Sequence, residues 1–242
     1  MRLKAGRFPL DSFSYLKVLQ GAPYDSDAVF SFGAISTADT VKTERGTVAL
    51  RRSDGTEWSV EELIAMQFAY IRDLAESTAG EKVYDVIVTV PPYYTQNERD
   101  AVVDAIEMSG LRTLGLINDG TAVAVNYAMT RTFAEPEFHL IYDAGASSIR
   151  ATVVEFGPVQ AEGKSKAGKD ATQITVRAVG FDRYNGGTEL DARLRNMMVT
   201  DFEKRYKRNI SQDKKAMAKL WKEAGRVKAI LSANNEAQAT VG

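Results

Sequence analysis

Asp143-Ala144-Gly145-Ala146-Ser147-Ser148 lies between two strand-like runs, Phe138–Tyr142 and Ile149–Phe156. The stretch therefore predicts a hairpin tip made of one carboxylate, small residues and hydroxyls. Backbone N–H groups in such a turn can converge on phosphate oxygens, and small side chains let a ligand approach the backbone. The carboxylate would face a metal ion or its water shell, because it would otherwise repel the phosphate. Taken alone, the stretch favours a plain tight hairpin slightly over a phosphate site.

The composition narrows the possible chemistry. The 242-residue chain can hold one large domain or two small lobes, and no apolar stretch reaches membrane-spanning length. A net charge of -1, from 31 Lys and Arg against 32 Asp and Glu, gives no overall attraction to nucleic acid or to an anionic membrane. The chain has no Cys and one His, which excludes thiolate and His-based metal sites and Ser-His catalysis. Carboxylates, Lys, hydroxyls and a bound metal remain as candidates.

The first half of the chain alternates strand and helix patterns. Ser59-Val60-Glu61-Glu62 is a capping box, which opens a helix that Gly80 ends. The rhythm of the segments that follow predicts a largely parallel sheet flanked by helices. The other predicted segments are strands at Val29–Ile35, Val48–Leu50, Val83–Val90 and Leu114–Ile117, a helix from Thr95 to Gly110, and an Ala- and Val-rich helix from Thr121 to Met129.

The pattern changes after Thr130–Pro136, a polar stretch that predicts a boundary. Pro158–Thr172, rich in Gly, Lys and Ala, predicts a mobile loop. Asn185-Gly186-Gly187 predicts a flexible turn before a helix, whose free N–H groups and dipole favour an anion. A plain loop with Thr188 as the helix cap explains the same residues. Ser211 is the expected cap of the last helix.

Four further residues combine a possible chemical role with a simpler explanation. Asp119 could orient water or metal hydration near a phosphate, or it could cap a helix. Lys17 could neutralise a transferring phosphoryl group, although a solvated lysine explains it as well. Lys228 and Ser232 share one side of the last helix and could bracket a nucleoside, although Lys228 also suits a surface charge.

Together these residues stand in an order that resembles the ATPase domain of the heat shock protein 70 family. The resemblance covers nearly the whole chain. Within that family, the chain is most similar to the large endoplasmic-reticulum branch (hypoxia up-regulated, glucose-regulated 170-kDa and Lhs types). The runs that carry the resemblance are Val83–Pro91, Asn97-Glu98-Arg99, Leu116–Ala124, Asp143-Ala144-Gly145, Val179–Arg183, Asn185-Gly186-Gly187, Ser211–Leu220 and Leu231–Asn234.

The resemblance implies an α/β fold: an actin-like ATPase (ribonuclease H-like motif) with two lobes around ATP or ADP, Mg and usually potassium. Residues 1–134 would supply part of lobe I, and residues 135–242 part of lobe II. Lys17, Asp119 and Asp143 would be the catalytic residues, with Asp143 holding Mg through water. The residues implied to bind the nucleotide are Gly145, Ala146, Ser147, Ser148, Gly186, Gly187, Gly225, Lys228 and Ser232.

Several positions depart from the family pattern. Asp119 is one methylene shorter than the usual Glu, and Gly120 replaces the usual Pro. Arg150 stands where standard members carry an Asp associated with potassium. The remaining departures are Ala146 and Ser147 at usual Gly positions, and Gly225 and Ala229 on the adenosine-side helix. ATP binding is therefore expected more strongly than efficient hydrolysis.

The resemblance also implies a function. We expect an ATP-binding molecular chaperone of the endoplasmic-reticulum lumen that aids protein folding under stress and exchanges nucleotide on the lumenal heat shock protein 70 chaperone. Its other partners would be unfolded polypeptides, with no nucleic acid or membrane. The alternative is a non-catalytic module that binds a partner and uses nucleotide only as a structural clamp. Because the first phosphate hairpin expected before Lys17 is missing, we expect an incomplete domain with weak or no ATP affinity and no activity by itself.

Overall fold

The computed structural model describes residues 8–159 and 171–241, so the mobile loop predicted at Pro158–Thr172 falls mostly outside the described residues. The chain divides into two compact units. The first comprises the residues up to Tyr84, Gln96–Arg112 and the residues from Thr188 on, and the second comprises Asp85–Thr95 and Thr113–Gly187. The lobe boundary expected after residue 134 falls inside the second unit, so the division into lobes stays a prediction. In the described ranges, no helix is both long and apolar enough to cross a membrane.

The first unit begins with two short 3-10 helices, η1 (Pro9–Asp11) and η2 (Leu16–Val18), followed by a helix and a small sheet. Strands β1 (Asp39–Lys42), β2 (Val48–Arg51) and β3 (Glu57–Ser59) pair antiparallel in that order. The core of the unit forms where β2 meets these helices. Its most deeply buried members are Leu19, Phe32, Val48, Leu50, Val60 and Ala105.

The strand predicted at Val29–Ile35 is wrong, because these residues belong to helix α2 (Asp27–Ile35). Val29 and Phe32 both pack on the core, and their spacing of three is that of a helix face. Phe30 lies two residues before Phe32, so the two side chains would point to the same face of a strand. Phe30 is nevertheless 83% exposed. A short apolar run fits either period, and here the contacts with the core decide.

Helix α3 (Val60–Ala79) confirms the predicted capping box and stop. Ser59 Oγ accepts the N–H of Glu62, and the Glu62 carboxylate accepts the N–H of Ser59 at 2.7 Å. Gly80 ends the helix with a φ of 75°, a left-handed conformation that suits glycine. Both signals are local, which is why the sequence shows them clearly.

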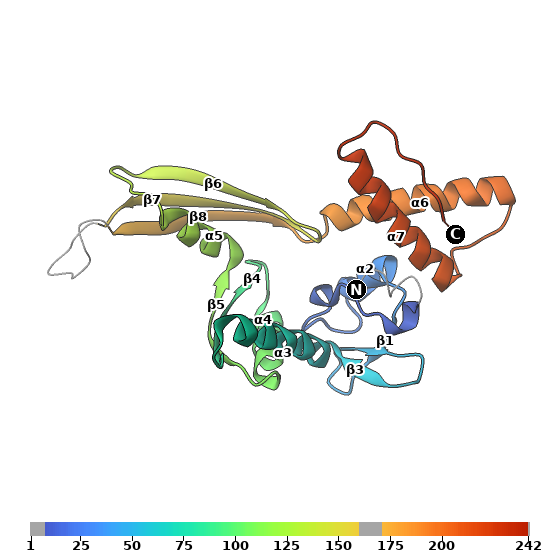
Figure 1. Cartoon of the computed structure of the whole chain (residues 1–242), viewed down its shortest axis with the longest axis horizontal. Coiled ribbons are helices and arrows are strands. Elements are labelled where there is room, and N and C mark those ends of the chain that lie inside the picture. The colour runs from blue at the N-terminus through green and yellow to red at the C-terminus, as the bar shows by residue number, and fades with distance from the viewer. Residues whose placement is uncertain (1–7, 160–170, 242) are drawn as a thin grey trace. The chain divides into compact units, whose positions relative to one another are not determined.

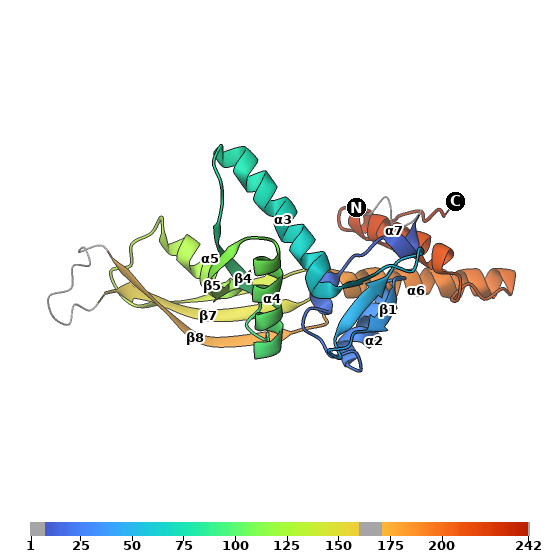
Figure 2. The same cartoon turned by 90° about the horizontal axis from the view of Figure 1, so that it is seen from below.

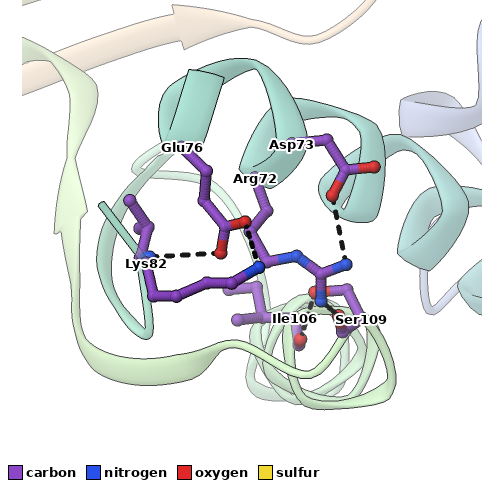
Figure 3. A network of polar contacts seen from close by, with 7 residues as sticks. Arg72, Asp73, Glu76, Lys82, Ile106 and Ser109 are labelled. Carbon is purple, nitrogen blue, oxygen red and sulfur yellow. Dashed lines mark hydrogen bonds and ion pairs between the residues drawn. The ribbon is translucent and has the colours of Figure 1, made fainter. Parts of the chain in front are cut away.

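A polar network joins α3 to the end of α4 (Gln96–Met108), as Figure 3 shows. Arg72 Nη1 donates to the Ser109 carbonyl at 2.6 Å, and Ser109 Oγ donates to the Ile106 carbonyl at 2.6 Å. Lys82 Nζ donates to Glu76 Oε2 at 2.8 Å, and this hydrogen bond lowers the pKa of the Glu76 carboxyl. Arg72 thereby gives a partner to the Ser109 carbonyl just past the end of α4, whereas the Ile106 carbonyl also accepts the N–H groups of Ser109 and Leu111.

Two longer helices complete the described part of the chain, α6 (Gly187–Tyr206) and α7 (Lys214–Leu231). The predicted Ser211 cap of α7 is wrong. Asp213 is the cap, since its carboxylate accepts the N–H groups of Lys215 and Ala216 at 3.0 and 2.9 Å. Ser211 instead donates its hydroxyl to Glu203 Oε1 at 3.2 Å.

In its described residues, the second unit contains two sheets and one helix. Strands β4 (Asp85–Val90) and β5 (Arg112–Asn118) form a two-stranded sheet, smaller than the rhythm of the sequence suggested. Strands β6 (Glu137–Ala144), β7 (Ile149–Pro158) and β8 (Thr172–Asp182) pair antiparallel in that order. Helix α5 (Asp119–Ala128) packs on this three-stranded sheet (Figure 1). Figure 2 shows β7 and β8 running side by side along the length of the sheet.

Aromatic packing holds α5 on the sheet. Phe133 stacks on Phe156 of β7 with ring centroids 4.8 Å apart, and Ala124 of α5 and Val154 of β7 complete the buried cluster. His139, the single His of the chain, packs its ring edge against Phe156 at 5.2 Å. This cluster fixes the face of the sheet on which α5 lies, and hence the position of the first residue of α5.

Candidate functional site

The turn Asp143–Ser148 is the tip of the β6–β7 hairpin, as predicted. The strand register pairs Ala144 with Ile149 and Asp143 with Arg150, and the Gly145 N–H closes the turn on the Ser148 carbonyl at 3.0 Å. In the described part of the chain, the N–H groups of Ala146 and Ser147 bind no other protein group. The turn therefore offers two adjacent backbone donors, which is the arrangement that an anion requires.

The second glycine-rich turn packs directly on the first. The Gly187 N–H donates to the Gly145 carbonyl at 3.1 Å. A Cβ on Gly186 would lie 2.6 Å from the Ala146 carbonyl oxygen, a distance that real Cβ atoms do not adopt. Glycine at position 186 thus allows the two backbones to meet. The structure brings together the two segments that the sequence nominated separately as phosphate-binding turns.

Asp119 is the first residue of α5, and Gly120 seats this end of the helix on β7. A Cβ on Gly120 would lie 2.2 Å from Thr152 Oγ1, so the helix could not approach this closely with any other residue there. Asp119 Oδ1 accepts the Gly120 N–H at 2.8 Å, which leaves Oδ2 for another donor. Thr152 and Arg150 lie two residues apart on β7 and so share one face of the sheet.

Arg150 occupies the space between the two carboxylates. Its Nη1 forms an ion pair with Asp119 Oδ2, and its Nη2 forms one with Asp143 Oδ2. The side chains of Arg150, Asp119 and Asp143 are 12%, 20% and 45% exposed. Sequence reasoning noted Arg150 as a departure but missed this bridge. The position of the turn could have indicated half of this bridge. In a hairpin whose turn is closed by residues 144 and 149, residues 143 and 150 are cross-strand partners.

The other predicted site residues belong to the first unit. Lys17 is the exposed middle residue of η2, and Gly225 and Lys228 lie on α7. Lys228 Nζ forms an ion pair at 2.8 Å with Asp191 Oδ1, which is buried on α6. Ser232 follows α7 and donates its hydroxyl to the Lys228 carbonyl at 3.0 Å. That these residues share one site with Asp119 and Asp143 stays a prediction.

A cavity of about 420 Å³ in the first unit is lined by residues that include Tyr15, Arg195 and Trp221, none of them a predicted site residue. Trp221 Nε1 donates to the Tyr15 hydroxyl at 2.8 Å, and the Arg195 guanidinium lies over the Trp221 ring at 5.1 Å. Burial lowers the pKa of Arg195, which also donates to the Ala34 carbonyl at 2.6 Å. Gly225, predicted to face adenosine, lines the same cavity. The cavity offers an indole, a phenol and a cation to a ligand.

The comparison with protein families decides what these elements belong to. The family described as Hsp70 protein matches residues 6–242, which is almost the entire chain. The chain belongs to the Hsp70 family. The predicted fold class is confirmed: an α/β Hsp70 nucleotide-binding domain of the actin-like ATPase type.

Curated relatives fall in the large branch of the Hsp70 family, as the sequence resemblance implied. The chain is 40% identical over 240 residues to hypoxia up-regulated protein 1 of Xenopus laevis, which covers 96% of this chain and 36% of that protein. It is 35% identical over 243 residues to heat shock protein 70 homolog lhs1 of Schizosaccharomyces pombe, and the match covers 98% of this chain and 28% of that protein. Heat shock 70 kDa protein 17 of Arabidopsis thaliana is 35% identical over 241 residues, and the match covers 97% of this chain and 28% of that protein. The chain thus spans about a third of the length of these relatives.

The Hsp70 fold implies a nucleotide, and the residues of the second unit fit its phosphates better than a directly bound Mg²⁺. The two packed turns leave backbone donors exposed and exclude side chains from their contact. By contrast, both carboxylates of the site are paired with Arg150. Within residues 8–159 and 171–241, no group of three or more His, Cys, Asp or Glu side chains could hold a metal ion. The site therefore fits a phosphate, and it does not fit a metal held by several protein ligands.

Proposed function

We propose that this chain supplies part of the nucleotide-binding domain of an ATP-binding molecular chaperone. The observation that carries the proposal is the contact between the Asp143–Ser148 turn and the Asn185–Gly187 turn. Two glycine-rich backbones that meet in this way, with N–H groups left over, suit the phosphates of ATP or ADP. Membership of the Hsp70 family supports the same ligand.

For the whole protein, we propose a role in polypeptide folding in the endoplasmic-reticulum lumen. The support is identity of 35–40% to hypoxia up-regulated and lhs1 proteins over most of this chain. Its partners would be unfolded polypeptides and the lumenal Hsp70 chaperone, whose nucleotide it would exchange. Lys17, Asp119 and Asp143 remain the proposed catalytic residues. Gly225, Lys228 and Ser232 would face the adenosine.

A second candidate is a partner-binding module in which nucleotide is only a structural clamp. Arg150 favours this candidate, because it engages both of the carboxylates that hydrolysis would need to orient water. A carboxylate held by a guanidinium is less available to a water molecule or to a metal hydration shell. ATP binding without efficient turnover would follow.

Single-turnover measurements on the protein purified from its native source separate the two candidates. A slow ATPase predicts cleavage of bound ATP that falls by about 10²-fold or more in Asp143→Asn. A clamp predicts tight binding with negligible cleavage in both the parent protein and the variant. Absence of ATP binding to the native protein would contradict both candidates.

For the 242-residue chain by itself, we propose weak ATP affinity. The sequence contains the Asp143 turn but no Asp-x-Gly-Thr turn before Lys17, so the proposed phosphate contacts come from one side only. Calorimetric titration with Mg-ATP should give a dissociation constant above about 100 μM, equivalent to less than about 5.5 kcal/mol of binding free energy. Micromolar or tighter binding would contradict this expectation.

A further inference from the structure

Arg150 joins two carboxylates that come from different elements of the second unit. Asp143 faces it across the β6–β7 pair, and Asp119 reaches it from the start of α5. The guanidinium uses a separate nitrogen for each carboxylate, Nη1 for Asp119 and Nη2 for Asp143. With 12% of its side chain exposed, Arg150 sits inside the site, in contrast to a surface ion pair.

The charges of this cluster explain why a cation stands between the carboxylates. Two carboxylates that converge on one point repel each other, and a positive charge between them removes the repulsion. A divalent metal ion or a guanidinium can supply that charge. Here the guanidinium already binds one oxygen of each carboxylate, so a metal ion could use those oxygens only by displacing it.

Displacement of Arg150 is unfavourable for two reasons. Arginine keeps its charge at every ordinary pH, so a displaced guanidinium would remain a buried cation without its partners. Its Nε is already buried without a hydrogen-bond partner among the described residues, so the two carboxylates supply the hydrogen bonds that hold the guanidinium. The arrangement therefore resists entry of a metal ion.

We propose that Arg150 is a built-in cation, which closes the Asp119–Asp143 pair to divalent metal ions and neutralises the pair in their place. Arg150 then acts as a positioning residue for the two carboxylates. Its consequence for ligands rests on the proposed nucleotide site: phosphates would bind beside the turn without a metal ion held by these carboxylates. The metal-binding part of the proposal stands without any nucleotide.

Titration with Mn²⁺ alone tests the proposal on the whole 242-residue chain. Free Mn²⁺ is followed by electron paramagnetic resonance, and bound Mn²⁺ by broadening of the Gly145 amide signal in NMR spectra. We expect the titrations of the parent chain and Asp143→Asn to coincide, with no broadening at Gly145. Arg150→Gln should gain a site at least about ten-fold tighter than any in the parent chain, because two carboxylates are then free to act as oxygen ligands.

Three comparisons test whether the gain is specific to Arg150. The double variant Arg150→Gln with Asp143→Asn should lose the new site. Arg177→Gln is the matched control, since Arg177 forms an ion pair with Glu155 on the same sheet and, among the described residues, bridges no second carboxylate. This control should gain no Mn²⁺ site. Arg150→Lys, which retains a positive charge, should gain less than Arg150→Gln.

Two results would overturn the proposal. One is Mn²⁺ binding to the parent chain that broadens Gly145 and disappears in Asp143→Asn. The other is a folded Arg150→Gln variant, judged by its circular dichroism melt, that gains no site. If Arg150→Gln does not fold, the comparison of the parent chain with Asp143→Asn still decides. Failure of ATP to bind would overturn the proposed function and leave the Mn²⁺ result unaffected.

Discussion

Gly120 at the start of α5 approaches Thr152 of β7 so closely that a Cβ at position 120 would lie 2.2 Å from Thr152 Oγ1. Thr152 is buried, with 4% of its surface exposed, so it has little room to move. This contact seats α5 on the sheet and brings Asp119 to Arg150. Gly120 was noted in the sequence as a replacement for proline, and the structure shows a tightly packed contact at this position.

Gly120→Ala should therefore destabilise the second unit and separate Asp119 from Arg150. We expect a loss of about 1–3 kcal/mol in the free energy of unfolding, the usual cost of overpacking a filled site. Urea denaturation of the parent chain and the variant measures it. Gly115→Ala is the control, because a Cβ on Gly115 meets no atom within 4 Å. Equal stability of the two variants would contradict the packing account.

Ser59→Ala should weaken α3, because it removes the hydroxyl that accepts the Glu62 N–H at the start of the helix. The expected loss is about 1 kcal/mol in the free energy of unfolding, the typical cost of losing such a cap. Ser77→Ala is the matched control, on the exposed surface of the same helix. It should change stability by less than about 0.5 kcal/mol. Chemical denaturation that shows no difference between the variants would contradict the role of the cap.

Glu223 should make the C-terminal segment sensitive to acid. Its carboxylate accepts hydrogen bonds from Arg226 at 2.6 and 2.9 Å and from the Thr240 N–H at 2.7 Å. The hydrogen bond from Arg226 is the main cause that lowers the pKa of Glu223 from its ordinary value of 4.5. Because the folded chain prefers the ionised form, this contribution to stability is complete above pH 4.5 and is lost as the pH falls through the lowered pKa.

The pH dependence of the Thr240 amide chemical shift measures this transition directly. We expect a midpoint below 4.5 in the parent chain and no transition in Glu223→Gln. Glu236→Gln, at an exposed position in the segment after α7, should keep the parent profile. A midpoint at or above 4.5 in the parent chain would contradict the stabilised carboxylate.

Local signals explain which parts of the fold the sequence predicts. The capping box at Ser59 and the stop at Gly80 act within one helical turn, so the pattern alone identifies both ends of α3. Val29–Ile35 failed as a strand because a short apolar run carries no period of its own, and the contacts of Phe32 with the core are not local. The cap of α7 shifted from Ser211 to Asp213 because Glu203, eight residues earlier at the end of α6, holds the Ser211 hydroxyl.

The candidate site likewise has one part that the sequence predicts and another that depends on packing. The hairpin and its small residues follow from the sequence between Asp143 and Ser148. The contact of Gly186 with this turn depends on where β8 ends, and the pairing of Arg150 with Asp119 depends on where α5 is seated. Both are properties of the packed unit, which explains why sequence reasoning identified the residues without the bridge between them.

The central claim is that the two packed turns form a phosphate site. Its most direct measurement is an NMR titration of the ¹⁵N-labelled chain with ADP at millimolar concentration and excess Mg²⁺. The claim predicts shifts at the amides of Gly145, Ala146 and Ser147, which Gly186→Ala abolishes because its Cβ would lie 2.6 Å from the Ala146 carbonyl oxygen. Gly180→Ala, whose Cβ would meet no atom within 4 Å, should retain them. Absence of shifts at these amides, or shifts that persist in Gly186→Ala, would contradict the claim.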